Sequence, residues 1–370
     1  MNAAAGGGDG EVRRFSALLA RPRVRYTLKV YAWIGIGLAT YFAAVWGLAW
    51  ALGVGYKVSL FNNLALAGAI YAICLVLGLL ARLAWIMLVR RPRRLFRHLA
   101  DDFTNTLFSL ERLILALPVL VGMPVAMSLY SSLKRMIPDL VPYRYDEAFW
   151  QIDRWLHFGH DPWEWLQPLL ATPATTSAIS TLYHEIWLLL LLLIWIWQAC
   201  SLARPHLRLQ FLITYLLVWV LLGNVGAVAL SSAGPVYYAE VTGLSSPYRL
   251  LFEYLYRADG ASGVSALKLQ EMLWASLASG GRGVGTGISA MPSVHVATTV
   301  VFALLAANYS RILGLLFAAY VTIVVVGSVH LGWHYAIDAY VSIVSTVALW
   351  RLVGAWLERT LPIASGRERD

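Results

Sequence analysis

Long apolar segments, each close to 20 residues and nearly free of charge, constrain this chain more than any other feature of its sequence. A helix needs about 20 apolar residues to cross the hydrocarbon core of a bilayer. Such segments predict eight transmembrane helices, at residues 30–54, 62–89, 111–132, 180–200, 209–230, 291–307, 312–329 and 335–357. Since 59% of the residues are hydrophobic and only 13% are charged, the chain lacks the polar surface of a water-soluble globule. The sequence therefore predicts an all-α, polytopic integral membrane helix bundle.

Basic residues gather in the connections between the apolar segments. Arginines fill the second connection, at residues 90–97, and Arg204 and Arg208 lie in the fourth. Since positively charged connections stay on the cytoplasmic side of a membrane, both termini are predicted to be cytoplasmic. The connections that then face outward are residues 133–177, 231–290 and 330–334. The same clustering explains the net charge of +9 as a topology signal, so no nucleic-acid partner is expected.

The expected location is the inner membrane of a bacterium, with the outer connections on the periplasmic face. The apolar segment at residues 30–54 is too long for the core of a signal peptide, so we expect it to be a retained anchor. A composition rich in Ala, Arg and Leu fits a bacterial membrane; a Golgi membrane, with the outer face luminal, is the alternative. Cys74 and Cys200 lie in or beside apolar segments, which excludes a disulfide framework.

The first outer connection contains a segment crowded with tryptophans and acids, DEAFWQIDRWLHFGHDPWEWLQP at residues 146–168. Amphipathic aromatic rings are favoured at the boundary between lipid and water. We interpret this segment as a helix lying in the outer interface. Its expected role is therefore structural.

Ionisable residues within apolar segments are costly, so those that occur there point to function. Of the 20 acidic residues, only Glu185 and Asp338 fall within predicted spans. Four of the eight histidines lie at span ends on the predicted outer face: His184, His295, His330 and His334. Histidines with independent structural roles would be found on both faces. The sequence therefore predicts one shared site at the outer face.

The densest part of this set is GSVHLGWHYAID, residues 327–338. On a helix, His334 and Asp338 are four residues apart and project from one face. The carboxylate can hold the proton of one imidazole nitrogen and leave the other as a nucleophile or base. An interfacial hydrogen bond is the alternative explanation of this pair. Pro292 and Ser293 begin another helix, where a hydroxyl and free N–H groups suit an anion, and His295 adds a proton donor. The combination suits phosphoryl transfer.

These residues carry a resemblance to a known family. PSVH at residues 292–295 and HYAID at 334–338 resemble the second and third motifs of the type 2 phosphatidic acid phosphatase superfamily. They are most similar to the branch that contains fungal inositol phosphorylceramide synthase and its bacterial relatives. GPVYY at residues 234–238 is similar to that branch's substitute for the first motif. The resemblance is specific over about residues 230–340.

The resemblance implies a role for each matched residue. His334 would be the nucleophile that forms a phosphohistidine, oriented by Asp338. His295 would protonate the leaving oxygen and then activate the acceptor, and Ser293 would hydrogen-bond the phosphate. Further substrate-binding residues are expected in the first motif: Gly234, Pro235, Tyr237 and Tyr238. The resemblance implies no metal and no other cofactor.

The chain departs from the phosphatase pattern where cations usually clamp the phosphate. The first motif reads Gly-Pro at residues 234–235, and Gly327-Ser328 stands in place of Ser-Arg. Arg282, just before the second motif, is expected to contact the phosphate instead; a solvated loop cation is the alternative. Arg14 through Pro22 matches the first-motif spacing, but it lies on the cytoplasmic side and is rejected. The missing clamp favours a phosphotransferase and leaves a phosphodiester substrate open.

We therefore expect a membrane enzyme that transfers or hydrolyses phosphoryl groups of lipid phosphates or phosphodiesters at the outer leaflet. It is most like a phospholipid headgroup phosphotransferase, with a phospholipid or lipid phosphate as donor and a lipid or polyol as acceptor. A simple lipid phosphate phosphatase is the alternative within the superfamily. The expected division is a basic cytoplasmic tail, two additional helices with an Arg-rich loop, a six-helix catalytic core and a second cytoplasmic tail, at residues 1–29, 30–110, 111–357 and 358–370.

A divalent-metal transporter or membrane metalloprotein is the alternative from another class. His330, His334 and Asp338 recur at four-residue spacing and, with His295, offer ligands for a zinc ion. A transporter, however, needs coordination near the middle of the membrane, whereas these residues stop at the outer face. A non-enzymatic lipid-binding protein would require none of them.

Overall fold

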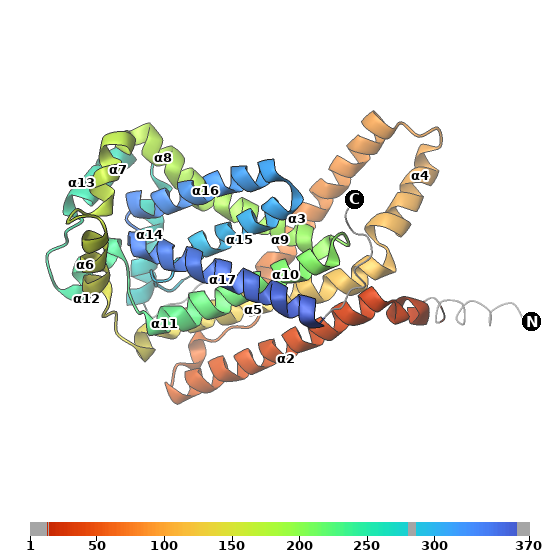
Figure 1. Ribbon diagram of the computed structural model, residues 1–370, viewed down its shortest axis with the longest axis horizontal. Helices are drawn as coiled ribbons and strands as arrows, with labels where there is room; N and C mark the ends of the chain where they lie inside the picture. Colours follow the sequence, from red (N-terminus) through yellow and green to blue (C-terminus); the bar gives the residue numbers. More distant parts are fainter. Residues whose placement is uncertain (1–12, 14, 280–285, 361–370) are drawn as a thin grey trace, which may run out of the picture. The chain divides into compact units, whose positions relative to one another are not determined.

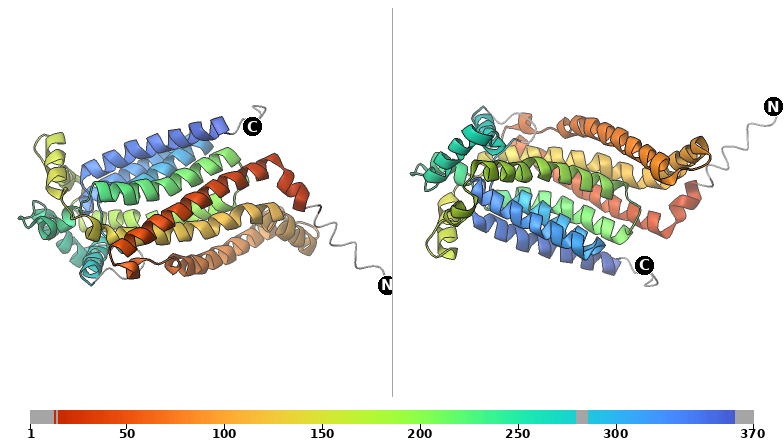
Figure 2. Two further views of the ribbon diagram at one scale, coloured as in Figure 1. Left: turned by 90° about the horizontal axis from the view of Figure 1, so that it is seen from below. Right: turned by 90° about the horizontal axis from the view of Figure 1, so that it is seen from above.

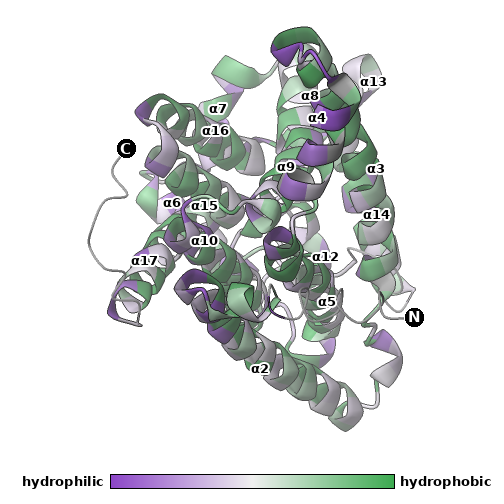
Figure 3. Ribbon diagram, turned by 90° about the vertical axis from the view of Figure 1, so that its right-hand side faces the viewer, coloured by the Kyte–Doolittle hydropathy of each residue, from purple (hydrophilic) through white to green (hydrophobic). Residues whose placement is uncertain are grey.

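The computed structural model describes residue 13 and residues 15–279 and 286–360, and in this part of the chain the secondary structure is helical without a β-strand. Seven of the described helices are long and apolar enough to cross a membrane: Pro22–Ala51, Asn63–Arg90, Leu110–Leu140, Pro173–Cys200, Pro205–Ala229, Arg311–His330 and Ala336–Thr360. Hydrophobic residues dominate most of their length (Figure 3). The predicted all-α membrane bundle is thereby confirmed.

The eighth predicted helix is present but shorter than a typical span. It was expected at residues 291–307, and the structure has α15 at Val294–Tyr309, with 16 residues. Its start is later because Ser293 is the N-cap, whose side chain accepts a hydrogen bond from the Val296 N–H.

The chain divides into two compact units. Unit 1 comprises residues 1–44, 60–128 and 196–209, and unit 2 comprises residues 45–59, 129–195 and 210–370. In unit 1, Arg82 of α3 (Asn62–Trp85) donates two hydrogen bonds to Asp102 of α4 (Leu95–Asp102), at 3.1 and 2.7 Å. Arg21 and Arg23 both pair with Glu111. The pairs to Glu111 lie beside a small apolar cluster of Leu18, Val24 and Leu115, so polar and apolar contacts together hold this end of unit 1.

Unit 2 is built around α15, which packs against α16 (Arg311–His330) and α17 (Ala336–Thr360) (Figure 1). Most of its buried residues are small or β-branched, and they let neighbouring helices approach closely: Val296, Ala297, Thr298, Thr299, Val300, Val301 and Ala306. At the α15–α16 turn, a Cβ on Gly314 would lie 2.9 Å from Ala307 Cα, so this approach requires glycine. α8 (Pro173–Thr181) also lies in unit 2, whereas α5 (Leu110–Leu140), α9 (Trp187–Cys200) and α10 (Pro205–Leu217) each contribute part of their length to it.

Short helices gather at one end of unit 2, as the further views also show (Figures 1 and 2). They are α6 (Asp146–Leu156), α7 (Pro162–Leu170), α12 (Tyr238–Thr242), α13 (Arg249–Ser262) and α14 (Ser265–Ala278). The segment expected as one interfacial helix at residues 146–168 forms two helices, because Gly159 has a φ of 87° and breaks it. Trp155 and Phe158 are 79% and 87% exposed there, and their position in a membrane interface stays a prediction.

Candidate active site

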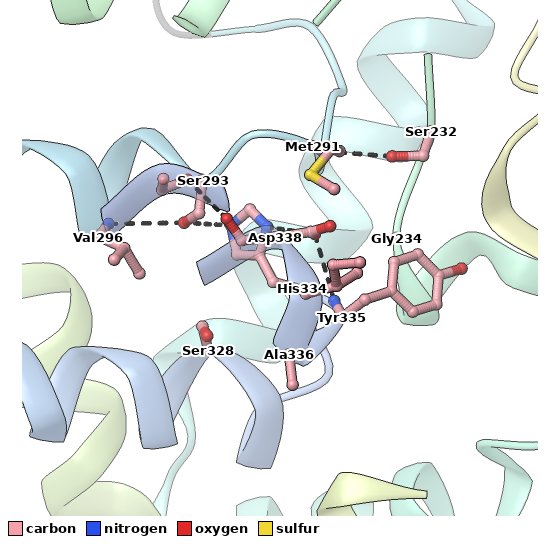
Figure 4. Close-up of polar contacts among 12 residues, drawn as sticks. Ser232, Gly234, Met291, Ser293, Val296, Ser328, His334, Tyr335, Ala336 and Asp338 are labelled. Atoms are coloured by element: carbon pink, nitrogen blue, oxygen red, sulfur yellow. Dashed lines mark hydrogen bonds and ion pairs between the residues drawn. The ribbon is translucent and has the colours of Figure 1, made fainter. Parts of the chain in front are cut away.

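The last two helices bring the third-motif residues together. His334 lies in the turn between α16 and α17, and Asp338 lies in the first turn of α17. His334 Nδ1 is 3.0 Å from Asp338 Oδ2, and both side chains are buried. The backbone N–H of Tyr335 also donates to that carboxylate oxygen, at 3.2 Å (Figure 4). Since the carboxylate favours a proton on Nδ1, His334 Nε2 keeps its lone pair.

Ser293 connects the second motif to this histidine. Its hydroxyl oxygen is 3.2 Å from His334 Nε2, and it also accepts a hydrogen bond from the Val296 N–H as the N-cap of α15 (Figure 4). Ser293 is fully buried and does not line the cavity described below. The contact therefore fixes the imidazole ring from the side of the helix start.

The turn that carries His334 depends on Ser328, which stands where the phosphatase pattern has its arginine. The carbonyl oxygen of Ser328 accepts hydrogen bonds from the backbone N–H groups of Trp333 and His334, at 2.9 and 3.1 Å. A Cβ on Gly327 would lie 3.0 Å from Ile179 Cγ2, so this residue packs closely against α8. These two residues shape the turn.

Aromatic rings hold His295, in the first turn of α15. Its ring stacks on Tyr183, with centroids 4.6 Å apart and an interplanar angle of 11°. Trp187 lies on it with centroids 3.9 Å apart, and the indole N–H of Trp187 donates to Thr298 Oγ1 at 3.0 Å. His295 is thus oriented by ring packing, whereas His334 is oriented by a carboxylate.

A cavity of about 260 Å³ in unit 2 exposes both histidines to a common space. Six aromatic side chains contribute to its lining: Tyr130, Tyr183, Trp187, Trp219, Tyr237 and Trp333. His184, His295, His334 and Lys134 add the ionisable groups. The cavity combines a large apolar wall with a few polar groups, which is typical of small-molecule sites. Of the residues expected to act on substrate, His295, His334 and Tyr237 lie in its lining.

The Gly-Pro motif lies against the loops that carry both histidines. Gly234 has a φ of 99°, and a Cβ there would lie 2.5 Å from the carbonyl oxygen of Trp333. The N–H of Val236 donates to the Gly332 carbonyl at 3.0 Å, on the loop before His334. On the other side, the Ser232 hydroxyl accepts from the N–H of Met291, just before the second motif, at 3.2 Å (Figure 4). Glycine is required here by close backbone packing.

The other first-motif residues differ in their surroundings. Pro235 is buried at the start of the short helix Pro235–Tyr237 and does not line the cavity. The Tyr237 hydroxyl donates to the Gln270 carbonyl at 2.7 Å while the residue lines the cavity. Tyr238 instead packs in the core against Trp150 and Tyr248. The structure therefore brings Tyr237 to the cavity and leaves Pro235 and Tyr238 outside its lining.

Two aspartates of α6 hold the motif loops, and neither was predicted from the sequence. Asp146 accepts hydrogen bonds from the N–H groups of Ala233 and Gly234 and from the Tyr335 hydroxyl, at 3.0, 2.8 and 2.9 Å. Asp153 accepts hydrogen bonds from the first turn of α17, from the N–H groups of Ala336 and Ile337 at 2.6 and 2.9 Å. The available signal was two acids seven residues apart, on one face of a tryptophan-rich helix.

Burial opposes the charge of these aspartates. Burial raises the pKa of Asp153 to about 6, against the lowering effect of the hydrogen bonds from Ala336 and Ile337. Burial likewise raises the pKa of Asp146, while the N–H groups of Ala233 and Gly234 lower it. Carboxylates at the start of a helix are stabilised by its free N–H groups, so α17 favours a charged Asp153.

Lys134 is a second residue that the sequence analysis missed. We expected the helix to end at residue 132, but α5 continues to Leu140 and places Lys134 in the cavity lining. Its Nζ is 5.9 Å from the centroid of the Tyr130 ring. Burial lowers the pKa of His334 below its ordinary value of 6.5, and the Lys134 charge lowers it further. Arg282, the cation expected to contact phosphate, lies outside the described residues.

His330 is separate from the His334–Asp338 pair. It is fully buried, and its Nε2 is 3.0 Å from the hydroxyl oxygen of Thr176 on α8. Within residues 15–279 and 286–360, no group of three His, Cys, Asp or Glu side chains is placed to hold a metal ion. The alternative metal site of His330, His334 and Asp338 therefore does not form in this part of the chain.

Comparison with known proteins gives one match. A family model described as the PAP2 superfamily matches residues 147–352, which is more than half of the chain. No curated protein and no solved structure matches. The matched range contains His295, His334 and Asp338, whereas Lys134 and Asp146 precede it.

Proposed function

The chain belongs to the PAP2 superfamily of phosphatases and phosphotransferases, and from this premise we propose that it transfers phosphoryl groups between lipid substrates through a phosphohistidine at His334. The observation that carries the proposal is the buried Asp338–His334 pair, whose imidazole lines the same cavity as His295. Of the members of the superfamily, a headgroup phosphotransferase of the inositol phosphorylceramide synthase type fits best. A lipid phosphate phosphatase is the second candidate.

In the first step, His334 Nε2 attacks the phosphorus atom of the donor. The N–P bond forms as the P–O bond to the leaving alcohol breaks, and protonated His295 donates a proton to the leaving oxygen. Asp338 keeps the Nδ1 proton in place and stabilises the positive charge that develops on the ring. Ser293 lies outside the cavity lining, so the nucleophile is assigned to the histidine.

In the second step, the now neutral His295 accepts a proton from the hydroxyl of the acceptor. The acceptor oxygen attacks phosphorus, the N–P bond breaks, and His334 is regenerated. Both proton transfers use His295, so the two steps together leave the enzyme unchanged. The aromatic lining of the cavity supports an alcohol acceptor over water, because rings cover apolar surface and exclude solvent.

The proposed setting is the outer leaflet of a bacterial inner membrane, with the cavity reached from the periplasmic face. Phospholipids or lipid phosphates are the proposed donors, and lipids or polyols are the proposed acceptors. The chemistry above needs no metal ion, since the two histidines supply the nucleophile and the proton transfers. Activity that persists in EDTA is therefore part of the proposal.

The test uses the purified full chain in detergent, with lipid phosphates and phosphodiesters radiolabelled at phosphorus. Reactions run with and without ceramide, diacylglycerol and inositol, and are quenched at acid and alkaline pH. The expected protein adduct is stable to alkali, labile to acid, lost in His334→Ala and retained in the control His160→Ala, whose imidazole is exposed. Asp338→Asn is expected to slow its formation strongly.

The fate of the label then separates the candidates. Label on an alcohol acceptor without free phosphate supports the phosphotransferase, whereas released phosphate identifies a lipid phosphatase. Normal activity in His334→Ala, or an adduct on Ser293, contradicts the proposed mechanism. Turnover that EDTA abolishes and a metal ion restores contradicts its metal independence.

A further inference from the structure

Lys134 lies in the wall of the cavity, where the loop at Gly287 packs against it. It projects from α5 into the lining that includes His295 and His334, and it is half-buried. A Cβ on Gly287 would lie 3.1 Å from Lys134 Cγ and 3.0 Å from its carbonyl carbon. The loop at Gly287 therefore packs directly on this lysine, and its φ of 109° allows that approach only for glycine.

The charge of Lys134 differs from the charges beside it. Lys57 Nζ is 2.5 Å from Asp139 Oδ2, and Arg135 donates to the Lys57 carbonyl oxygen at 2.5 Å. Among the described residues, no carboxylate forms an ion pair with Lys134, whose Nζ faces the Tyr130 ring at 5.9 Å from the ring centroid. A cation in a largely aromatic cavity loses hydration, and an anion is needed to compensate it.

We propose that Lys134 binds the non-bridging oxygens of the phosphoryl group that His334 attacks, in place of the cations absent from the first and third motifs. The inference rests on the proposed function, since the bound anion is the substrate's phosphate. An ammonium group offers three donors on a flexible stem, so it can follow the oxygens as phosphorus moves from the leaving oxygen to Nε2.

The position also suits the charge changes of the reaction. Burial lowers the pKa of His334 and the Lys134 charge lowers it further, which keeps this imidazole neutral for attack. A cation beside the phosphoryl oxygens stabilises the charge that they carry in the transition state. The same residue thus supports both the nucleophile and the group that it attacks.

The first experiment measures anion binding without turnover. Inorganic phosphate is titrated into the full chain in detergent, and its Kd is obtained from the shift in melting temperature. Lys134→Met is expected to weaken binding by about 10-fold or more, and Lys134→Arg by less than about 3-fold. The matched control is Lys268→Met on α14, an exposed lysine, which should leave the Kd unchanged.

Equal phosphate affinity of the wild type and Lys134→Met overturns the inference, as does a wild type that binds no phosphate. Lys134→Gln provides a second neutral variant should Lys134→Met fail to fold. The second experiment measures phosphohistidine formation with the lipid donor that gives the wild-type adduct. The expected loss of rate in Lys134→Met is about 10-fold or more, with recovery in Lys134→Arg.

The two experiments separate this inference from the proposed function. Phosphate binding that depends on Lys134, in a chain that forms no adduct with any lipid donor, supports the anion site and contradicts the phosphotransferase. Adduct formation at an unchanged rate in Lys134→Met supports the phosphotransferase and contradicts the role of this lysine.

Discussion

The Asp153 carboxylate lies 2.6 Å from the backbone nitrogen of Ala336, so an acid of α6 holds the start of the helix that carries Asp338. The N–H of Ile337 donates to the other oxygen of the same carboxylate. Residues almost 200 positions apart are joined in this way, and the orientation of the His334–Asp338 pair depends on the connection. α6 is therefore part of the framework that positions this pair as well as a surface helix.

Asp153→Asn should impair turnover without abolishing adduct formation. An amide has one acceptor oxygen, so one of the two N–H bonds from Ala336 and Ile337 is lost and its donor is left unpaired. We expect kcat to fall by about 10-fold or more, since a hydrogen bond to a charged group contributes about 1.5–3 kcal/mol. The comparison is Glu147→Gln, an exposed acid of the same helix. Equal activity of both variants contradicts a positioning role for Asp153.

Gly234→Ala should destabilise the protein through a steric clash. The added Cβ would lie 2.5 Å from the Trp333 carbonyl oxygen, on the loop that precedes His334. Gly243 separates this clash from the cost of a positive φ, because its φ is 70° and no atom lies within 4 Å of its Cβ position. We expect Gly234→Ala to lower the melting temperature and the rate of adduct formation well beyond Gly243→Ala. Similar melting curves for the two variants would contradict the predicted clash, because they would show that the loop at Gly234 can move away from the loop at Trp333.

His295→Asn should slow adduct formation in a manner that depends on the leaving group. A general acid contributes about 10²- to 10⁴-fold when the leaving oxygen is a poor leaving group, such as an alkyl alcohol. 4-Nitrophenolate leaves without protonation. The variant should therefore react with a 4-nitrophenyl phosphoester at close to the wild-type rate. Rates are measured by rapid quench for both donors. An equal loss with both donors indicates that His295 acts by packing against Tyr183 and Trp187 only.

The rate of adduct formation should fall on the acid side of its pH profile. The midpoint of this acid limb should lie below the ordinary pKa of an imidazole. Protonated His334 cannot attack, so the rate falls as pH drops through its pKa, which burial and Lys134 lower from 6.5. The groups that face this imidazole include Asp338 at Nδ1, Ser293 at Nε2, the Ala290 backbone, and Lys134 and His295 in the cavity lining. Lys134→Met removes one positive charge, raises the pKa of His334 and moves the limb to higher pH.

This profile is measured by rapid quench between about pH 4 and about pH 9. Lys134→Arg keeps the charge and should keep the wild-type limb. A limb that stays in place in Lys134→Met contradicts the electrostatic contact between this lysine and His334.

Local sequence patterns predicted the helices and the central pair of the site. Apolar segments of sufficient length predict membrane helices because the thickness of the bilayer sets their length. The contact between His334 and Asp338 was predicted from their four-residue spacing, and the two side chains do meet, although His334 lies in the turn before α17 and its position also depends on contacts from the rest of the fold. The expected division of the chain into tails, added helices and core stays a prediction.

Local patterns did not predict the contacts that form only when distant segments of the chain pack together. Asp146 meets Tyr335 only after α6 has packed against the start of α17, 189 residues later in the chain. Lys134 was assigned to a loop because SSLKRMIPD ends the apolar segment, although α5 continues through it. The buried ion pair and backbone contacts of Lys57, Arg135 and Asp139 explain how a helix extends into polar sequence there.

The short length of α15 sets the depth at which the proposed reaction takes place. Its 16 residues span about 24 Å, whereas the hydrocarbon core of a bilayer is about 30 Å thick. Arg311 begins the next helix two residues after its far end, and we expect this arginine to lie near one membrane surface. His295, in the first turn, is then expected several ångströms beneath the opposite surface. Donor and acceptor lipids can then react while their acyl chains stay in the leaflet. Their headgroups would lie below the membrane surface, at the depth of the two histidines.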